Sequence, residues 1–130
     1  MKELSSDERL LAESANYYIV ASFESCSLYR KSDDSFVCVV GDHYGDPTGA
    51  VISPSEDFCV TVGCGAVVYF LRVPFEDYSY SVASPSWYEF GRDPKGILWI
   101  ESVTVRGSSV VLVDETGQEH IHVVQCDIRS

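Results

Sequence analysis

Positive charge is scarce in this sequence. Nine Lys and Arg residues stand against twenty Asp and Glu residues, and the formal net charge is -11. Nucleic acids and anionic membrane surfaces bind proteins largely through basic side chains that neutralise phosphates. The composition therefore argues against a nucleic-acid or membrane partner. A positively charged protein is the natural complement of this chain.

Long apolar runs are also missing. No segment approaches the roughly 20 apolar residues of a membrane-spanning helix, and the first residues lack the apolar stretch of a secretory signal peptide. We therefore expect a cytoplasmic protein. At 130 residues, with 45% apolar and 22% charged residues, the chain is predicted to form one globular domain over residues 1–130.

Recognisable catalytic and cofactor motifs are absent from the sequence. No serine stands in a G-x-S-x-G nucleophile elbow, and no cysteine lies in a known nucleophile context. Gly63-Cys64-Gly65 leads into an apolar run without a following lysine, unlike a phosphate-binding loop. We therefore predict that the protein is not an enzyme, has no catalytic residues and needs no metal or other cofactor.

Cysteines are present in an odd number, five, and they are scattered among apolar neighbours at Cys26, Cys38, Cys59, Cys64 and Cys126. In a reducing compartment such cysteines behave as small buried hydrophobic residues. No second pair of Cys or His residues stands at zinc-finger spacing from Cys59 and Cys64. We expect five reduced, mostly buried thiols.

Sequence periodicity predicts a mainly β domain, of α+β type with little helix. Ser5–Asn16 has apolar residues at helix-like intervals and capping residues at its start, which predicts one short helix over about 5–16. From Tyr17 the apolar period becomes two, which predicts a β domain over 17–127. Short turns favour antiparallel pairing, most simply a meander sheet curved into a sandwich or roll. The expected strands cover residues 17–24, 28–31, 36–40, 49–53, 58–62, 66–71, 97–105, 110–113 and 121–126.

The expected sheet is organised around Gly41–Leu71. Two apolar runs, Phe58–Val62 and Ala66–Leu71, flank Gly63-Cys64-Gly65 in a strong hairpin pattern. Ala66–Leu71 contains no polar residue, which predicts a central strand covered on both faces. The preceding turn, GDHYGDP, combines two glycines, two aspartates and a proline, and it should present acidic side chains at a rigid rim.

A long aromatic stretch, PFEDYSYSVASPSWYEFG, interrupts the strand pattern. Its six aromatic residues are interleaved with acids, and loops of this length in compact domains are often functional. We predict that it forms a partner-binding surface; the alternative is that its rings close one end of the core. With the aspartates of GDHYGDP, the candidate interface comprises Asp42, Asp46, Glu76, Asp77, Tyr78, Tyr80, Trp87, Tyr88 and Glu89.

Histidines provide an alternative site. His43 lies between Asp42 and Asp46, and His120 and His122 share one face of an expected strand. Imidazole and carboxylate groups are common metal ligands. A small enzyme or metal-binding module that uses the His43, Asp42 and Asp46 turn is therefore the alternative to a binding protein. A structural adaptor subunit is a third hypothesis.

Four stretches of the chain, GDHYGDPTGAVIS, PFEDY, WYEFGRDP and ILWI, carry a resemblance over roughly residues 40–100. They resemble a group of small bacterial proteins encoded near polymorphic toxins, similar to immunity proteins against contact-dependent or type VI delivered toxins. The resemblance implies an inhibitor that binds and neutralises a cognate toxin, and it transfers no catalytic residue. The acidity of the chain favours a basic toxin such as a nuclease. The toxin's identity and the oligomeric state stay open.

Overall fold

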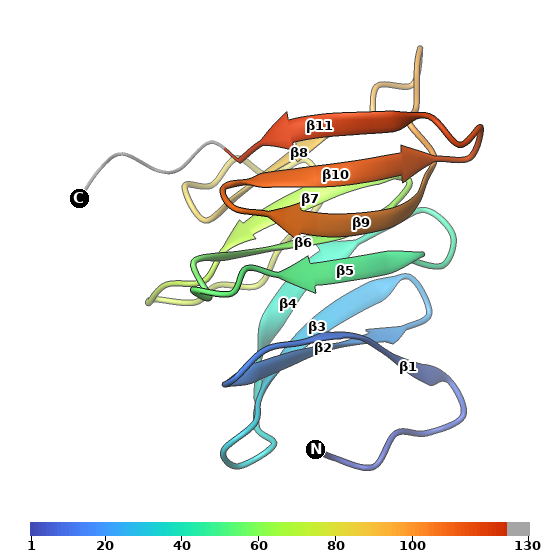
Figure 1. Cartoon of the computed structure of the whole chain (residues 1–130). Coiled ribbons are helices and arrows are strands. Elements are labelled where there is room, and N and C mark those ends of the chain that lie inside the picture. Colours follow the sequence, from blue (N-terminus) through green and yellow to red (C-terminus); the bar gives the residue numbers. More distant parts are fainter. Residues whose placement is uncertain (125–130) are drawn as a thin grey trace.

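Three antiparallel sheets make up the computed structural model, which describes residues 1–124 (Figure 1). The first sheet contains β1 (Glu8–Glu13), β2 (Tyr17–Ser22), β3 (Ser25–Arg30) and β4 (Phe36–Asp42). The second sheet contains β5 (Gly49–Ile52), β6 (Phe58–Gly63), β7 (Gly65–Phe70) and β8 (Trp87–Phe90). The third sheet contains β9 (Ile100–Arg106), β10 (Ser109–Asp114) and β11 (Glu119–Val123). Strands that follow one another pair within each sheet, as short connections favour.

The predicted mainly β, antiparallel architecture is confirmed, but the predicted helix over 5–16 is wrong. Glu8–Glu13 is an edge strand that pairs with β2 and carries a bulge at Leu11. Isolated helices of about 12 residues are marginal in water, whereas pairing with β2 satisfies the backbone of β1. The bulge also allows three consecutive apolar residues, Leu10 to Ala12, to be half-buried. Residues 1–124 hold no helix of the length and apolarity needed to cross a bilayer.

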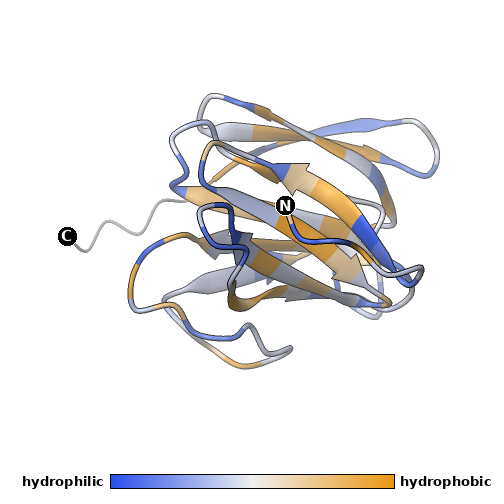
Figure 2. Cartoon of the chain, turned by 90° about the horizontal axis from the view of Figure 1, so that it is seen from below, coloured by the Kyte–Doolittle hydropathy of each residue, from blue (hydrophilic) through white to orange (hydrophobic). Residues whose placement is uncertain are grey.

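The second sheet lies between the other two sheets, and an apolar core covers each of its faces. On one face, Cys59 and Tyr69 pack with residues from β2, β3 and β4. On the opposite face, Val60 and Phe70 pack with residues from β9 and β10. Successive side chains of a strand point to opposite faces, so every residue of β6 and β7 is buried. The two-sided cover expected for Ala66–Leu71 is confirmed for Ala66–Phe70. In Figure 2 hydrophobic segments follow the strands and hydrophilic ones lie mainly at turns.

The aromatic stretch expected to be irregular contains a strand and covers a sheet edge. Trp87–Phe90 forms β8, which pairs with β7 from Tyr69 opposite Trp87 to Ala66 opposite Phe90. Further upstream, Asp77 Oδ1 accepts a hydrogen bond from the Val39 amide at 2.9 Å, and the Tyr78 amide donates to the Val39 carbonyl at 2.8 Å. This segment therefore occupies backbone groups along the outer edge of β4.

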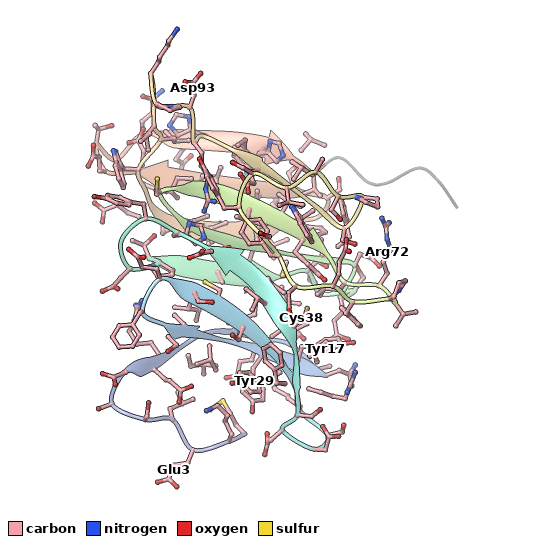
Figure 3. The ribbon with its side chains drawn as sticks, turned by 180° about the vertical axis from the view of Figure 1, so that it is seen from behind. Glu3, Tyr17, Tyr29, Cys38, Arg72 and Asp93 are labelled. Carbon is pink, nitrogen blue, oxygen red and sulfur yellow. The ribbon has the colours of Figure 1, made fainter. Side chains whose placement is uncertain are left out.

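The thiols of the described residues are protected by burial. Four cysteines are free and buried, Cys26, Cys38, Cys59 and Cys64, and Figure 3 shows Cys38 on β4. Desolvation raises the pKa of Cys26 to about 12 and that of Cys38 to about 11, which suppresses the reactive thiolate. The fifth cysteine, Cys126, lies outside the described residues.

We expect these four thiols to react with an alkylating reagent slowly in the native protein and completely after unfolding. A Cys126→Ser variant keeps the four buried thiols alone, and mass spectrometry counts the labels with time at pH 8. A native Cys126→Ser protein that takes up four labels as quickly as the unfolded protein would contradict the burial of these side chains.

Candidate functional site

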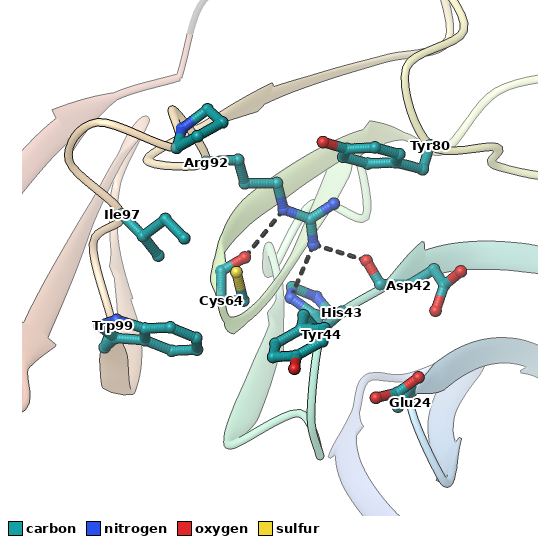
Figure 4. A pocket seen from close by; sticks show the side chains of 10 residues that line it. Glu24, Asp42, His43, Tyr44, Cys64, Tyr80, Arg92, Ile97 and Trp99 are labelled. Atoms are coloured by element: carbon teal, nitrogen blue, oxygen red, sulfur yellow. Dashed lines mark hydrogen bonds between the residues drawn. The ribbon is translucent and has the colours of Figure 1, made fainter.

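A groove lies where the β4–β5 connection, the β6–β7 turn and the segment before β9 meet (Figure 4). Its larger part has a volume of about 430 Å³ and is lined by Glu24, Asp42, His43, Tyr44, Cys64, Tyr80, Arg92, Pro94, Ile97 and Trp99. A smaller hollow of about 250 Å³ shares Tyr44, Cys64 and Trp99 with the larger one. We call the two together the Tyr44–Trp99 groove, the larger part the Arg92 lobe and the smaller part the acidic lobe.

The floor of the groove is the glycine-containing turn between β6 and β7. The segment that follows β8 passes very close to this turn. Gly65 has a φ of 69°, and an added Cβ would lie 2.5 Å from Arg92 Cγ and 2.6 Å from the Phe90 carbonyl oxygen. Only glycine fits both this backbone conformation and this approach. The Gly65 amide donates to the Leu98 carbonyl at 2.8 Å, and the Leu98 amide donates to the Gly91 carbonyl at 2.8 Å. The groove therefore rests on a hydrogen-bonded backbone.

Arg92 holds the Arg92 lobe together through hydrogen bonds to groups of the protein itself. Its Nε donates to the Cys64 carbonyl at 2.8 Å, and its Nη2 donates to the Asp42 carbonyl at 2.6 Å and to His43 Nδ1 at 2.8 Å (Figure 4). Its side chain is only 9% exposed. The guanidinium thus ties the end of β4 to the β6–β7 turn. Because these donors are already used inside the protein, Arg92 shapes the groove rather than offering a binding group to a ligand.

Tyr78 and Glu89 complete the surroundings of the Arg92 guanidinium. Arg92 Nη1 donates to the Tyr78 hydroxyl oxygen at 2.9 Å and lies 3.8 Å from Glu89 Oε2, and the Tyr78 hydroxyl donates to the Glu89 carboxylate. Burial, followed by the hydrogen bond to Glu89, raises the pKa of Tyr78. The phenol therefore stays protonated, and the carboxylate offsets the charge of the largely buried guanidinium.

His43 is buried under the groove in one defined tautomer. Arg92 can only donate, so His43 Nδ1 is the acceptor and Nε2 carries the proton, which it donates to Thr61 Oγ1 at 2.9 Å. The ring is 3% exposed. Burial, with a smaller effect of the Arg92 charge, lowers the pKa of His43 to about 3. Neither ring nitrogen is available to a metal ion.

The pKa of His43 predicts a loss of stability in mild acid. The unfolded chain, with an ordinary imidazole pKa of about 6.5, binds the proton more readily than the folded chain does. The contribution is fully present above pH 6.5 and falls as the pH is lowered. Between pH 6.5 and pH 5 we expect a loss of about 2 kcal/mol in the free energy of unfolding.

Urea unfolding at several pH values measures this dependence. A His43→Asn variant retains an acceptor for Arg92 and has no titrating ring, so its stability should change less over the same pH range. Equal pH dependence in the two proteins would mean that His43 is not the group that titrates.

The other two described histidines do not join this site. His120 Nε2 lies 2.8 Å from Asp114 Oδ2, and this hydrogen bond is the main cause of the lowered pKa of Asp114. His122 Nε2 lies 2.8 Å from the Tyr88 hydroxyl, and its ring stacks on Phe90 at a centroid distance of 4.2 Å. Within residues 1–124 no three His, Cys, Asp or Glu side chains are grouped as metal ligands.

The rim of the groove combines exposed rings with negative charge. The side chain of Tyr44 is 79% exposed, that of Tyr80 57% and that of Trp99 37%. No lysine lines either lobe. Five exposed carboxylates belong to the lining residues of the two lobes, namely Glu24, Asp42, Asp46, Glu101 and Glu115. Apolar anchors surrounded by charge of one sign are the composition of a protein-binding surface.

The structure brings three of the nine predicted interface residues together at this groove, Asp42, Asp46 and Tyr80. Tyr78 and Trp87 are 5% and 7% exposed and belong to the core between the first and second sheets. For these two rings, closure of the core is the correct alternative, and they cannot act as exposed anchors.

The four remaining predicted residues lie outside the groove lining. Glu89 pairs with Tyr78 and Arg92 beneath the groove, and Asp77 is bound to the edge of β4. Glu76 is exposed and accepts a hydrogen bond from Ser84. Tyr88 packs against Phe70 and His122, beside the core between the second and third sheets.

Sequence reasoning missed most of the groove lining. Tyr44 stands within GDHYGDP, and a ring held between two aspartates in a rigid turn was a usable signal. Arg92 and Trp99 lie in the WYEFGRDP and ILWI stretches, from which the sequence predicts a resemblance and, for Trp99, a place in the strand over 97–105, but no role in a site. Glu101 and Glu115 carry no such signal, because the fold alone brings them to Trp99.

Comparison with known proteins adds no relative to this description. A scan against protein-family models found no match to the chain, and a search of curated proteins found none. The function is therefore argued from the chemistry of the groove.

Proposed function

We propose that this chain is a non-enzymatic immunity protein that binds a cognate bacterial toxin domain through the Tyr44–Trp99 groove and neutralises it. The observation that carries the proposal is a set of three exposed rings, Tyr44, Tyr80 and Trp99, around a hollow bordered by five carboxylates. Interfaces draw most of their energy from a few aromatic or Arg anchors, while charges at the rim steer association. The groove offers both components on a rigid floor.

The proposed partner is a basic toxin domain, such as a nuclease, met in the cytoplasm after contact-dependent or type VI delivery. The net charge of -11 attracts a basic surface over a distance and accelerates association. A nuclease binds the phosphates of its substrate with basic side chains, and the carboxylates of the groove rim would occupy the same side chains. Inhibition follows from exclusion of the substrate.

The geometry favours binding over the catalytic or metal-binding alternative. That alternative needs a free ring nitrogen on His43, and both nitrogens are engaged by Arg92 and Thr61. Asp42 and Asp46 are exposed at the rim, where their carboxylates are accessible to a partner. A binding surface can therefore use both carboxylates as they are, exposed at the rim.

A growth assay tests the proposal. The protein encoded by the neighbouring gene is expressed in a bacterial host, alone and together with this chain. We expect it to arrest growth when alone, and we expect co-expression to restore growth and to yield a complex that co-purifies. A harmless neighbour, or toxicity that persists with this chain present and folded, would contradict an immunity function.

The groove makes a specific prediction for this complex. Tyr44→Ala and Trp99→Ala should each weaken toxin binding by about 2 kcal/mol if the rings are the anchors. Because Tyr44 is 79% exposed, Tyr44→Ala should change the free energy of unfolding by less than about 1 kcal/mol, whereas Trp99, which is 37% exposed, loses more packing when it is truncated. Calorimetric titration and urea unfolding measure the two quantities.

The matched control is Phe36→Ala, because Phe36 is 51% exposed and begins β4 at the end opposite Asp42. Its loss should leave toxin affinity unchanged. Toxin affinity that is unaffected by both groove substitutions would place the interface elsewhere on the molecule.

A further inference from the structure

The two lobes of the Tyr44–Trp99 groove differ in charge. The Arg92 lobe has a guanidinium at its floor, whose position disfavours a second cation. The acidic lobe is lined by three carboxylate side chains, those of Asp46, Glu101 and Glu115, and by no Lys or Arg. No ion pair within the part of the chain that the structure describes involves these three carboxylates.

Arg9, a base that binds the chain next to Asp46, is already occupied. Arg9 on β1 donates from Nη2 to the carbonyl oxygen of Pro47 at 2.8 Å, beside Asp46 in sequence. Its hydrogen bond holds the β4–β5 connection to the first sheet, and Arg9 does not line the lobe. The three carboxylates therefore keep their charge available to a cation from outside the chain.

Aromatic walls give the acidic lobe a preference among cations. Tyr44 and Trp99 line it together, and Figure 4 shows their rings on opposite sides of Cys64. The backbone holds the Trp99 wall, because Trp99 pairs with Cys64 and accepts a hydrogen bond from the Glu115 amide at 3.0 Å. A planar, weakly hydrated guanidinium stacks on aromatic faces and pairs with carboxylates through several donors.

The size of the acidic lobe favours one side chain over a free metabolite. Pockets for drug-sized ligands have volumes of about 300 to 1,000 Å³, and this lobe has about 250 Å³. It adjoins the Arg92 lobe, with which it shares Tyr44, Cys64 and Trp99 as lining residues. A side chain that enters one lobe can therefore belong to a protein whose neighbouring residues lie along the other.

We propose that the acidic lobe is the receptor for an arginine side chain of the protein partner, with its guanidinium against Tyr44 and Trp99 and its charge facing Asp46, Glu101 and Glu115. This inference rests on the proposed function for the identity of the partner and names the chemistry by which the partner is recognised. The Arg92 lobe then receives uncharged parts of the same partner surface.

Nuclear magnetic resonance with a small probe tests the inference without any toxin. The probe is N-acetyl-arginine methylamide, and the chain has two tryptophans whose indole N–H signals report separately. Trp99 lines the lobe, whereas Trp87 is buried and donates its Nε1 hydrogen to the Val82 carbonyl at 3.0 Å. We expect a saturable shift of the Trp99 signal and no shift of the Trp87 signal.

Two controls separate charge from shape and location. N-acetyl-citrulline methylamide has nearly the shape of the arginine probe without its charge, and it should bind about tenfold more weakly. The variant Asp46→Asn/Glu101→Gln/Glu115→Gln should lose a similar factor for the arginine probe. The matched variant, Glu3→Gln/Asp7→Asn/Glu13→Gln, removes the same number of charges near the N-terminus, and Figure 3 shows Glu3 at the end of the molecule opposite Asp93. It should keep the affinity.

Equal binding of the arginine and citrulline probes, or equal losses in the two triple variants, would overturn the receptor assignment. Tighter binding of N-acetyl-lysine methylamide would overturn the choice of arginine. These outcomes are independent of the growth assay, so a failed receptor with successful rescue of growth would leave the proposed function standing. A saturable arginine site without rescue would instead contradict only the immunity function.

Discussion

Trp87→Ala should lower the free energy of unfolding by about 4 kcal/mol, the range of large aromatic truncations in a core. Trp87 is 7% exposed, stacks on Tyr69 with ring centroids 6.1 Å apart and meets the edge of Tyr78 at 5.3 Å. Its indole N–H also donates to the Val82 carbonyl. Truncation removes apolar contacts, leaves a cavity between two sheets and leaves that carbonyl without its donor. Urea unfolding followed by circular dichroism measures the change.

A substitution in the same segment serves as the control for Trp87→Ala. Tyr80 is 57% exposed, and Tyr80→Ala should change the free energy of unfolding by no more than about 0.5 kcal/mol. Trp87→Phe, which preserves a ring but loses the indole donor, should fall between the two. If Trp87→Ala proved no more damaging than Tyr80→Ala, Trp87 would belong to the surface and not to the core.

Arg92→Ala should cost about 3 kcal/mol, because it removes a largely buried guanidinium and its hydrogen bonds to several acceptors at once. The carbonyls of Cys64 and Asp42 lose their guanidinium partner, and so does His43 Nδ1. Glu89 also loses the positive charge at 3.8 Å. Because the same donors hold the Arg92 lobe together, the substitution should lower stability and should also weaken binding of the partner proposed above.

Two further variants test whether the loss of stability in Arg92→Ala comes from losing the planar, forked set of guanidinium donors. Arg92→Lys keeps the charge but not the planar set of donors, so it should recover less than half of the lost stability. Arg106 on β9 is exposed, and Arg106→Ala should be neutral within about 0.5 kcal/mol. Urea unfolding of the three variants provides the comparison. Full recovery with lysine would show that charge alone, without the hydrogen bonds, stabilises this corner.

The sequence predicted best the strands that are covered by other sheets on both faces, because burial on both faces requires a run of apolar residues. β6 and β7 have cores on both faces, so all their residues are buried and nearly all are apolar, Thr61 of β6 being the polar exception, and short glycine spacing defines the hairpin. β1 was mistaken for a helix because Leu10, Leu11 and Ala12 straddle a bulge and do not alternate. β8 was hidden because its residues are only partly buried beyond Trp87. In both cases the pairing partner, which local sequence does not contain, decides the structure.

The candidate site was predictable only where a local turn creates it. Asp42 and Asp46 reach the rim because the glycines and proline of one turn position them. Tyr78 and Tyr80 look alike in the sequence, each an aromatic residue near acids, yet one is buried and the other exposed. Their fates differ because the Tyr78 amide binds the edge of β4 and turns its ring toward the core. Glu101 and Glu115 join the rim through the packing of the third sheet, which no sequence motif encodes.

The segment around Asp77 covers the outer edge of β4, and this cover affects the tendency of the protein to aggregate at high concentration. An outer strand with free amide and carbonyl groups is a template for strand addition and for growth into aggregates. Here Val39 already exchanges two hydrogen bonds with Asp77 and Tyr78, so an incoming strand would first have to displace the chain's own segment. If the chain is the inhibitor proposed above, which must be present before its target arrives, this cover would allow it to accumulate without polymerising along that border.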